Sequence, residues 1–314
     1  MSSDTGTRAI VAALLANMGI AVTKFGAFLV SGSSSMLAES VHSVADSGNQ
    51  VLLLVGGRRS QREATDEHPF GYGRERYVYA FVVSIVLFSV GGVFSIYEGI
   101  HKIQHPEAIT NPAVPITVLL IATGLESFSL RTAVNESNRV RFGRSWVQFI
   151  RHAKAPELPV VLLEDVAALI GLLLAMIGVV TSVVTGNGVW DGVGTIAIGL
   201  LLVGIAVILG VETKSLLVGE GASPVDVSSI RQALEEDPGI ERVIHMKTLY
   251  LGPDELLVAA KVGIHVGATS QEVIAAIDAA ERRVRDAVPV ARVIYLEPDV
   301  FDPSRAPAAA GPAD

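Results

Sequence analysis

Six long apolar segments constrain this chain more than any other feature. Each is long enough to cross about 30 Å of hydrocarbon at about 1.5 Å per residue of helix. The chain is 50% hydrophobic and only 18% charged, and its apolar residues are gathered into runs rather than spread in short amphipathic pieces. The sequence therefore predicts an α-helical membrane protein with six transmembrane helices, at residues 9–30, 36–57, 78–100, 112–134, 158–184 and 189–212.

The overall composition argues against several classes of function. A formal net charge of −8 argues against nucleic acid as a partner. Cysteine is absent, which removes disulfides, thiolate metal sites and cysteine nucleophiles together. The first residues, MSSDTGT, lack the basic region and cleavage site of a signal peptide and the arginine content of a transit peptide. We therefore expect the first segment to be an uncleaved anchor.

The distribution of Lys and Arg between the loops predicts the orientation in the membrane. Loop 58–77 holds five arginines, and loop 135–157 holds four arginines and a lysine. On the opposite side Lys102 stands alone. We therefore expect a multi-pass protein of the cell (inner) membrane with both termini in the cytoplasm.

Part of the second basic loop reads RVRFGRSWVQFIRHAK, which mixes arginine with Phe142, Trp146, Phe149 and Ile150. This composition is typical of a helix that lies at an anionic membrane surface. An ordinary basic cytoplasmic loop is the other interpretation, and the sequence leaves both open.

From about residue 220 the composition becomes that of a soluble domain. SPVDVSSIRQALEEDPG and SQEVIAAIDAAERRVRDAV have helix start and stop signals, whereas IERVIHMKTLYLG, DELLVAAKVGIHV and ARVIYLEPD read as strands. The order αββαβ predicts a small ferredoxin-like or metallochaperone-like cytoplasmic domain over residues 216–300, after a transport domain over residues 1–215. The Pro- and Ala-rich residues 301–314 are expected to be disordered.

A polar stripe runs along the second segment, in MLAESVHSVADSGNQ. Glu39, His42, Asp46 and Asn49 recur at steps of three and four, so on a helix they share one face. A charged side chain in mid-membrane costs about 2.5–3.5 kcal/mol, and such residues usually face the bundle interior and mark an ion or proton pathway. The spacing places Asp46 close to the membrane midplane.

The fifth segment supplies matching carboxylates. VVLLEDVAALIG is apolar except for Glu164 and Asp165, which also lie well inside the hydrocarbon. Imidazole and carboxylates at similar depth on two helices can form a site for a divalent cation, and zinc favours tetrahedral sites of nitrogen and oxygen. The structural alternative is a polar network in which Lys24 or Asn17 of the first segment neutralises the carboxylates.

SGSSSMLAESVHSVADSGNQ, followed by DEHPFGYGRERY, resembles the second span and first cytoplasmic loop of the cation diffusion facilitator family. The resemblance extends from about residue 7 to 300, and VVLLEDVAALIG is similar to the branch that contains the mitochondrial-type zinc transporters. It implies a homodimeric, proton-coupled exporter of Zn²⁺ or a related divalent metal, and no enzyme. The metal is then transported substrate rather than a resident cofactor, with Mn²⁺, Fe²⁺, Co²⁺, Cd²⁺ and Ni²⁺ also open.

The resemblance also implies a central site with two ligands from the second span and two from the fifth. His42 and Asp46 match the first pair and Asp165 matches the last position, but the remaining position falls on Val161, which cannot bind a metal. On a helix Asp165 lies about 40° to one side of Val161 and Glu164 about 60° to the other. Glu164 is therefore the expected substitute, and the predicted metal ligands are His42, Asp46, Asp165 and Glu164.

Another arrangement of the fifth-span residues stays open. Glu164 can instead face another span and pair with Lys24 or an arginine, with water or Asn49 completing the shell. The accessory sites of the family are also depleted in this chain. Tyr72 stands where the family's zinc prototype has a second loop histidine after His68, and the C-terminal domain has few histidines.

Two other functions compete with metal export. Glu39-x-x-His42 and Glu98-x-x-His101, with lone glutamates on two further spans, supply the ligands of a di-iron carboxylate enzyme. Their depths along the spans argue against one shared cluster, since Glu39 and Glu98 lie near the outer ends of their spans, whereas Glu126 lies about 20 Å in from the outer side and Glu164 enters from the cytoplasmic side. The other alternative is a transport-inactive family member that acts as a scaffold or heterodimer subunit, which the valine at the ligand position suggests.

Overall fold

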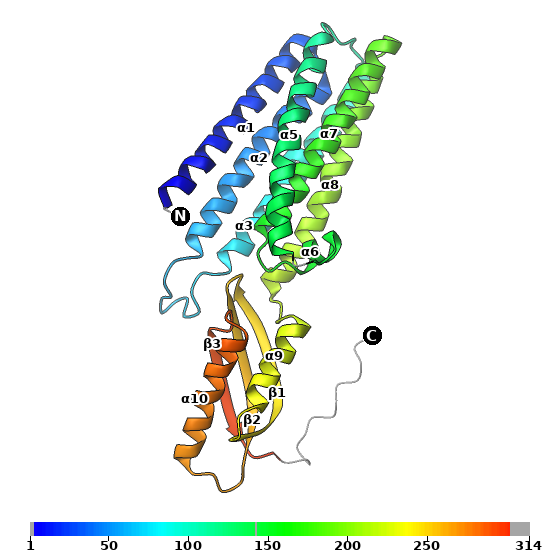
Figure 1. Ribbon diagram of the computed structural model, residues 1–314. Helices are drawn as coiled ribbons and strands as arrows, with labels where there is room; N and C mark the ends of the chain where they lie inside the picture. The colour runs from blue at the N-terminus through cyan, green and yellow to red at the C-terminus, as the bar shows by residue number, and fades with distance from the viewer. Residues whose placement is uncertain (1–2, 142, 302–314) are drawn as a thin grey trace. The chain divides into compact units, whose positions relative to one another are not determined.

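A computed structural model describes residues 3–141 and 143–301 (Figure 1). The described chain forms two compact units. One comprises residues up to 59 together with 75–214, and the other comprises residues 60–74 together with those from 215 onward. Residues 302–314, for which the sequence predicts disorder, lie outside the described part.

The first unit is a bundle of long helices that run side by side (Figure 1). α1 packs on α2 and α5, α2 also packs on α3 and α7, and α5 packs along α7. The helices are α1 (Ser3–Ser31), α2 (Ser34–Arg59), α3 (Glu75–Val86), η1 (Leu87–Val93), α4 (Phe94–Gln104), α5 (Ala113–Val140), α6 (Trp146–His152), α7 (Glu157–Thr185) and α8 (Val189–Val218).

Four helical stretches of the described chain are long and apolar enough to cross a membrane. They are Glu75–Gln104, Ala113–Val140, Glu157–Thr185 and Val189–Val218. They coincide with the third to sixth predicted segments, although α3, η1 and α4 together form the third. The described side chains of α1 supply only a shorter apolar stretch, Asn17–Ser31. α2 has 26 residues, about 39 Å of helix, and is long enough to cross a membrane. Its polar side chains make it less apolar than the four stretches above.

The surface of α2 has the opposite polarity to that of a helix in a water-soluble protein. Glu39 and His42 are buried, whereas Val44 is 50% exposed and Val51 is 40% exposed. Elsewhere in the bundle, Phe128 is 73% exposed. Polar groups inside and large apolar groups outside are the arrangement that a hydrocarbon solvent favours. The polarity of α2 therefore agrees with a helix of a membrane bundle even though its mean hydropathy is low.

A buried carboxylate fixes the start of α2. Asp191 of α8 is 0% exposed, and its oxygens accept hydrogen bonds from the Ser34 amide at 2.7 Å and the Ser33 hydroxyl at 2.9 Å. Free amides and the positive end of the helix dipole make a helix N-terminus a favourable place for a carboxylate. The Lys102 ammonium donates to the Gly32 carbonyl at 2.8 Å. These contacts fix the position of α2 along the bundle.

Glycines let α4 and α8 approach backbone to backbone. A Cβ on Gly199 would lie 2.8 Å from the Ile96 nitrogen and 2.9 Å from the Gly92 carbonyl oxygen. A Cβ on Gly99 would lie 2.7 Å from the Gly192 carbonyl oxygen. Small residues at such crossings give close van der Waals packing, which is a main source of helix association in membranes.

The second unit contains a three-stranded sheet covered on one face by two helices (Figure 1). The strand order is β1-β2-β3, with β1 antiparallel to β2 and β2 parallel to β3. One hydrophobic cluster joins both helices to the inner face of the sheet. The predicted order αββαβ is confirmed, with α9 at Pro224–Glu235, β1 at Ile240–Gly252, β2 at Glu255–Ile264, α10 at Ser270–Ala287 and β3 at Val293–Asp299.

The first basic loop packs against this sheet domain rather than against the bundle. Residues 60–74 belong to the second unit. A Cβ on Gly73 would lie 2.7 Å from the Leu251 carbonyl oxygen, and one on Gly252 would lie 2.8 Å from the Cα of Gly73. The glycine-rich end of the loop is thus required for a close backbone contact with the β1–β2 turn.

The glycine packing gives a test of the bundle. In Gly199→Ala the new methyl group meets backbone atoms that cannot rotate away, and overpacking of this kind costs about 1–3 kcal/mol. Gly204→Ala on the same helix is the matched control, because nothing lies within 4 Å of a Cβ there. We expect Gly199→Ala to lower the melting temperature of the purified protein in detergent while Gly204→Ala leaves it unchanged or raises it. Equal melting temperatures would contradict the backbone contact.

Candidate metal-binding site

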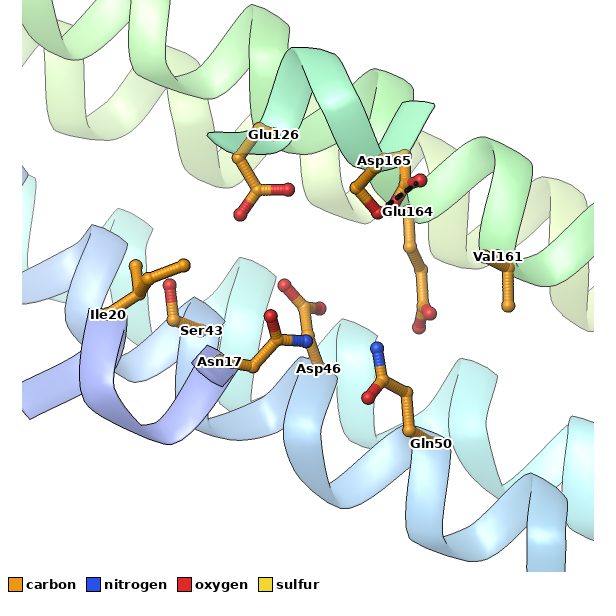
Figure 2. A pocket seen from close by; sticks show the side chains of 10 residues that line it. Asn17, Ile20, Ser43, Asp46, Gln50, Glu126, Val161, Glu164 and Asp165 are labelled. Carbon is orange, nitrogen blue, oxygen red and sulfur yellow. Dashed lines mark hydrogen bonds between the residues drawn. The ribbon is translucent and has the colours of Figure 1, made fainter. Parts of the chain in front are cut away.

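A small polar cavity lies inside the bundle between α1, α2, α5 and α7 (Figure 2). The space open to the centre of a water molecule in it is about 20 Å³, enough for about one water or one ion. Side chains from α1 and α2 face side chains from α5 and α7 across this space. The lining residues are Asn17, Ile20, Ser43, Asp46, Gln50, Glu126, Ser129, Val161, Glu164 and Asp165.

Four of the lining side chains are carboxylates. They come from three helices: Asp46 from α2, Glu126 from α5, and Glu164 and Asp165 from α7. Neither lysine nor arginine is among the lining residues. Carboxylates gathered in an apolar bundle repel one another unless a cation or protons neutralise them. The cavity therefore has the charge and the donor atoms to hold a cation.

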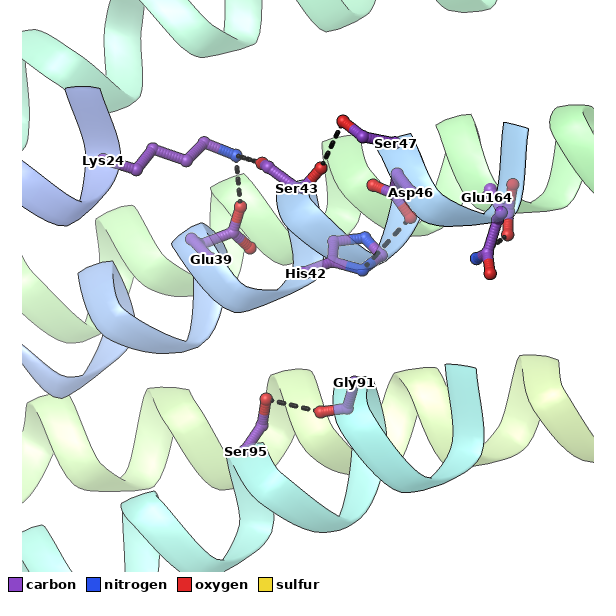
Figure 3. Close-up of polar contacts among 10 residues, drawn as sticks. Lys24, Glu39, His42, Ser43, Asp46, Ser47, Gly91, Ser95 and Glu164 are labelled. Atoms are coloured by element: carbon purple, nitrogen blue, oxygen red, sulfur yellow. Dashed lines mark hydrogen bonds and ion pairs between the residues drawn. The ribbon is translucent and has the colours of Figure 1, made fainter. Parts of the chain in front are cut away.

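His42 lies next to Asp46 but behind the cavity wall. Its Nδ1 is 3.5 Å from Asp46 Oδ1, one helical turn along α2 (Figure 3). His42 is 1% exposed, and neither of its ring nitrogens has a hydrogen-bond partner within the described residues. Asp46 is 17% exposed, and its Oδ1 also lacks such a partner. Buried polar atoms without partners are rare and call for an explanation such as an ion or a functional role.

The two acidic residues of α7 point to different neighbours. Glu164 is 5% exposed, and its Oε1 accepts a hydrogen bond of 2.6 Å from Asn49 Nδ2 on α2. Asp165 Oδ2 accepts a hydrogen bond of 3.0 Å from the Ser129 hydroxyl on α5. Neither residue is paired with Lys24. Glu164 is therefore hydrogen-bonded to Asn49, a contact that neither arrangement left open by the sequence includes.

The buried lysine of α1 is committed to another carboxylate. Lys24 Nζ is 2.9 Å from Glu39 Oε2 and donates to the Ser43 hydroxyl at 2.9 Å (Figure 3). Lys24 is 1% exposed and Glu39 0%. Gly171 of α7 leaves room for this pair, because a Cβ there would lie 2.8 Å from Glu39 Oε1. Lys24 therefore neutralises Glu39. The carboxylates that line the cavity have no lysine or arginine beside them in its lining.

The predicted ligands are only partly brought together. Asp46, Glu164 and Asp165 line one cavity, whereas His42 reaches it only through Asp46. Among the described residues, no group of three or more His, Asp or Glu side chains converges closely enough to hold a metal ion. The oxygen-bearing side chains thus surround one cavity but do not converge on a single point inside it.

Glu126 is the lining residue that sequence reasoning missed. From the sequence it is considered only as a lone glutamate of the di-iron alternative, yet its side chain lines the same cavity as Glu164. α5 packs along α7, and this packing brings Glu126 and Ser129 level with Asp165. The spacing of three between Glu126 and Ser129 on one apolar helix is the signal that could have identified this face.

One face of the sheet in the C-terminal domain carries a histidine beside charged side chains. His245 pairs with Lys261, and Lys261 with Glu297, across the three strands. Lys261 Nζ is 2.9 Å from Glu297 and 3.0 Å from Asp299. Hydrogen bonds to these two carboxylates raise the pKa of Lys261. A protonated lysine in the middle of this face makes it a poor place for a cation.

Comparison with known proteins agrees with the architecture of the bundle. A family model described as the cation efflux transmembrane domain matches residues 10–218. The chain is 31% identical over 242 residues to a protein of Xenopus laevis named proton-coupled zinc antiporter SLC30A9, mitochondrial, covering 76% of this chain and 43% of that protein. It is 29% identical over 257 residues to metal tolerance protein C4 of Arabidopsis thaliana, covering 81% of this chain and 56% of the relative.

More distant similarity extends to bacteria. Magnetosome protein MamM of Magnetospirillum gryphiswaldense is 24% identical over 233 residues, covering 72% of this chain and 67% of that protein. The chain spans less than half the length of the SLC30A9 proteins that it matches. The match covers the whole helical bundle, including the polar stripe of α2 and the carboxylates of α7, and it is to a family of transporters rather than of enzymes. This chain therefore belongs to the cation efflux family, the cation diffusion facilitators, and within it is similar to the mitochondrial-type branch.

Proposed function

We propose that this chain exports Zn²⁺ or a related divalent transition-metal cation from the cytoplasm in exchange for protons. The observation that carries the proposal is the cavity between four helices, lined by four carboxylates and by no basic side chain. The relatives named as zinc antiporters and metal tolerance proteins support the substrate class. We propose a homodimer with six transmembrane helices and cytoplasmic termini, in which α1 and α2 complete the set of spans.

The proposed cargo ligands are His42, Asp46, Asp165 and Glu164, with Glu126 as a further carboxylate of the same cavity. His42 does not line the cavity, so as a ligand it must turn its ring toward the cavity from its place beside Asp46. Glu164 accepts the hydrogen bond of Asn49 on Oε1 and retains Oε2 for the metal. Binding of the metal ion then requires that side chains already around the cavity converge on that ion.

The donor atoms indicate which metals the site accepts. One imidazole with several carboxylates suits Zn²⁺, and an oxygen-rich set discriminates less sharply against Mn²⁺ or Fe²⁺ than a two-histidine site does. Cysteine is absent from the chain, so thiolates are not available for Cu⁺. Co²⁺, Cd²⁺ and Ni²⁺ remain within the range of the proposed ligands.

Proton coupling follows from the chemistry of the same ligands. Histidine binds metal through a neutral ring nitrogen and carboxylates bind metal when ionised, so metal and protons compete for one set of groups. Metal that enters from the cytoplasm displaces protons, and protons from the other side displace metal after the bundle rocks open. Each unit of pH difference contributes about 1.36 kcal/mol per coupled proton.

The first test separates ligands from neighbours by Zn²⁺ binding to purified protein. Glu164→Gln, Asp165→Asn and Glu126→Gln keep side-chain size but remove the charge. A true ligand should lose at least about tenfold in affinity, since even second-shell changes cost about 10–100-fold. Gln50→Ala, on the cavity wall but uncharged, is the control. If Glu164→Gln stays within about twofold of the native affinity, Glu164 is not a ligand and the site has three protein donors.

The second test measures flux in proteoliposomes. We expect His42→Ala and Asp46→Asn to abolish Zn²⁺ flux, because both lie on the buried face of α2, whereas His68→Ala, an exposed loop histidine, keeps it. Size-exclusion chromatography checks that each variant is folded. Native flux in either of the two α2 variants would remove the central claim. A native protein that binds Zn²⁺ but never transports it would instead be the scaffold or heterodimer subunit.

The third test concerns coupling. Zn²⁺ flux should follow an imposed pH gradient across the liposome membrane and should fall when an ionophore collapses that gradient. An internal pH dye should report proton movement opposite to the metal. Flux that is independent of the gradient would leave a uniporter.

A further inference from the structure

Two histidines stand side by side at the end of α4. His101 and His105 are four residues apart, and their ring centroids are 4.9 Å apart with the ring planes tilted by 33°. Both side chains are exposed. Their ring nitrogens have no hydrogen-bond partner within the described residues. The Tyr97 ring continues the stack on the inner side, with its centroid 6.5 Å from that of His101.

The separation of the rings is the one that a shared metal ion requires. A zinc ion lies about 2.0–2.1 Å from each histidine nitrogen, and the ring centre lies about 1.1 Å beyond that nitrogen. Two rings on one tetrahedral ion therefore have their centres about 5 Å apart. The observed centroid distance of 4.9 Å matches this separation.

The backbone that carries the pair is held in place. The His105 amide donates to the His101 carbonyl at 2.9 Å and closes the last turn. Between the two histidines, Lys102 is anchored on the Gly32 carbonyl. One turn earlier, Gly99 packs against the backbone of α8 at Gly192. A pair of ligands fixed in this way loses little freedom when it binds a metal.

We propose that His101 and His105 form a second metal site, for a divalent transition-metal ion that accepts nitrogen ligands, such as Zn²⁺ or Ni²⁺. No third His, Asp or Glu of the described chain converges on the pair, so water completes the coordination shell. With two protein ligands instead of three or four, the bound ion exchanges readily. The site is thus suited to transient capture rather than to permanent structural binding.

The location of the pair suggests when it is filled. α3, η1 and α4 form one continuous stretch of 30 residues, about 45 Å of helix. Loop 58–74 precedes one end of this stretch and the histidines occupy the other. Under the proposed export function the cargo leaves at the histidine end, so the pair takes up released ions there. This timing rests on the proposed function, whereas metal binding by the pair does not.

The experiment is Zn²⁺ protection against diethyl pyrocarbonate, which modifies exposed histidine rings, read by peptide mass spectrometry on the full-length protein. We expect Zn²⁺ to protect His101 and His105 together, at one concentration. His152 and His265, which are also exposed, are internal controls and should not be protected at that concentration. Because loss of one of two ligands removes the chelate, His101→Ala should raise the concentration that protects His105 at least about tenfold.

The outcomes separate this proposal from the proposed function. Protection of His105 that is unchanged in His101→Ala, or that equals protection of His265, would overturn the two-histidine site. The same holds if Zn²⁺ leaves both modification rates unchanged, which would mean that the rings only stack. Asp46→Asn should abolish flux and keep the protection. Protection without any flux would refute export and leave this site standing, and flux without protection would do the reverse.

Discussion

The bundle depends on how it accommodates ionisable groups that have no access to bulk water. A charge in mid-membrane costs about 2.5–3.5 kcal/mol unless something neutralises it. Glu39 is neutralised by Lys24, and Asp191 is satisfied by hydroxyl and amide donors at the start of α2. Both groups are thereby structural. The carboxylates of the cavity are not compensated in this way, and that difference is why we assign them to the proposed metal site.

Backbone packing makes this separation possible. Glycines bring α4 and α8 into backbone contact, so these helices hold the α1–α2 turn through Lys102 and Asp191. On the other side of α2, Gly171 leaves the space into which Glu39 projects. Asp191 and Lys102 thus hold the start of α2, and about one turn later Glu39 of α2 is paired with Lys24. Further along it is open toward α5 and α7, and the cavity lies there.

Hydropathy and helix spacing predict much of this arrangement. The third to sixth apolar segments and the αββαβ domain follow directly from runs and periods in the sequence. The face shared by His42 and Asp46 also follows, because both lie on one helix. The π-helical segment Leu87–Val93, in which Gly91 and Gly92 lie against α8, carries no comparable signal. The partners of Lys24 and Glu164 could not be predicted, because contacts between helices depend on how each helix is rotated and shifted against its neighbours.

Val161 stands at the position where the resemblance to the family implies a metal ligand. Its side chain borders the cavity but also packs against a hydrophobic cluster of Ala133, Phe149 and Leu162, which joins α6 to α5 and α7. A polar ligand at this position would disrupt that cluster. The carboxylates on either side, Glu164 and Asp165, lie on the cavity instead, and Glu126 adds an oxygen donor from α5. The packing of α6 thus accounts for an apolar residue at position 161, and the donor atoms that line the cavity beside it are mainly carboxylate oxygens.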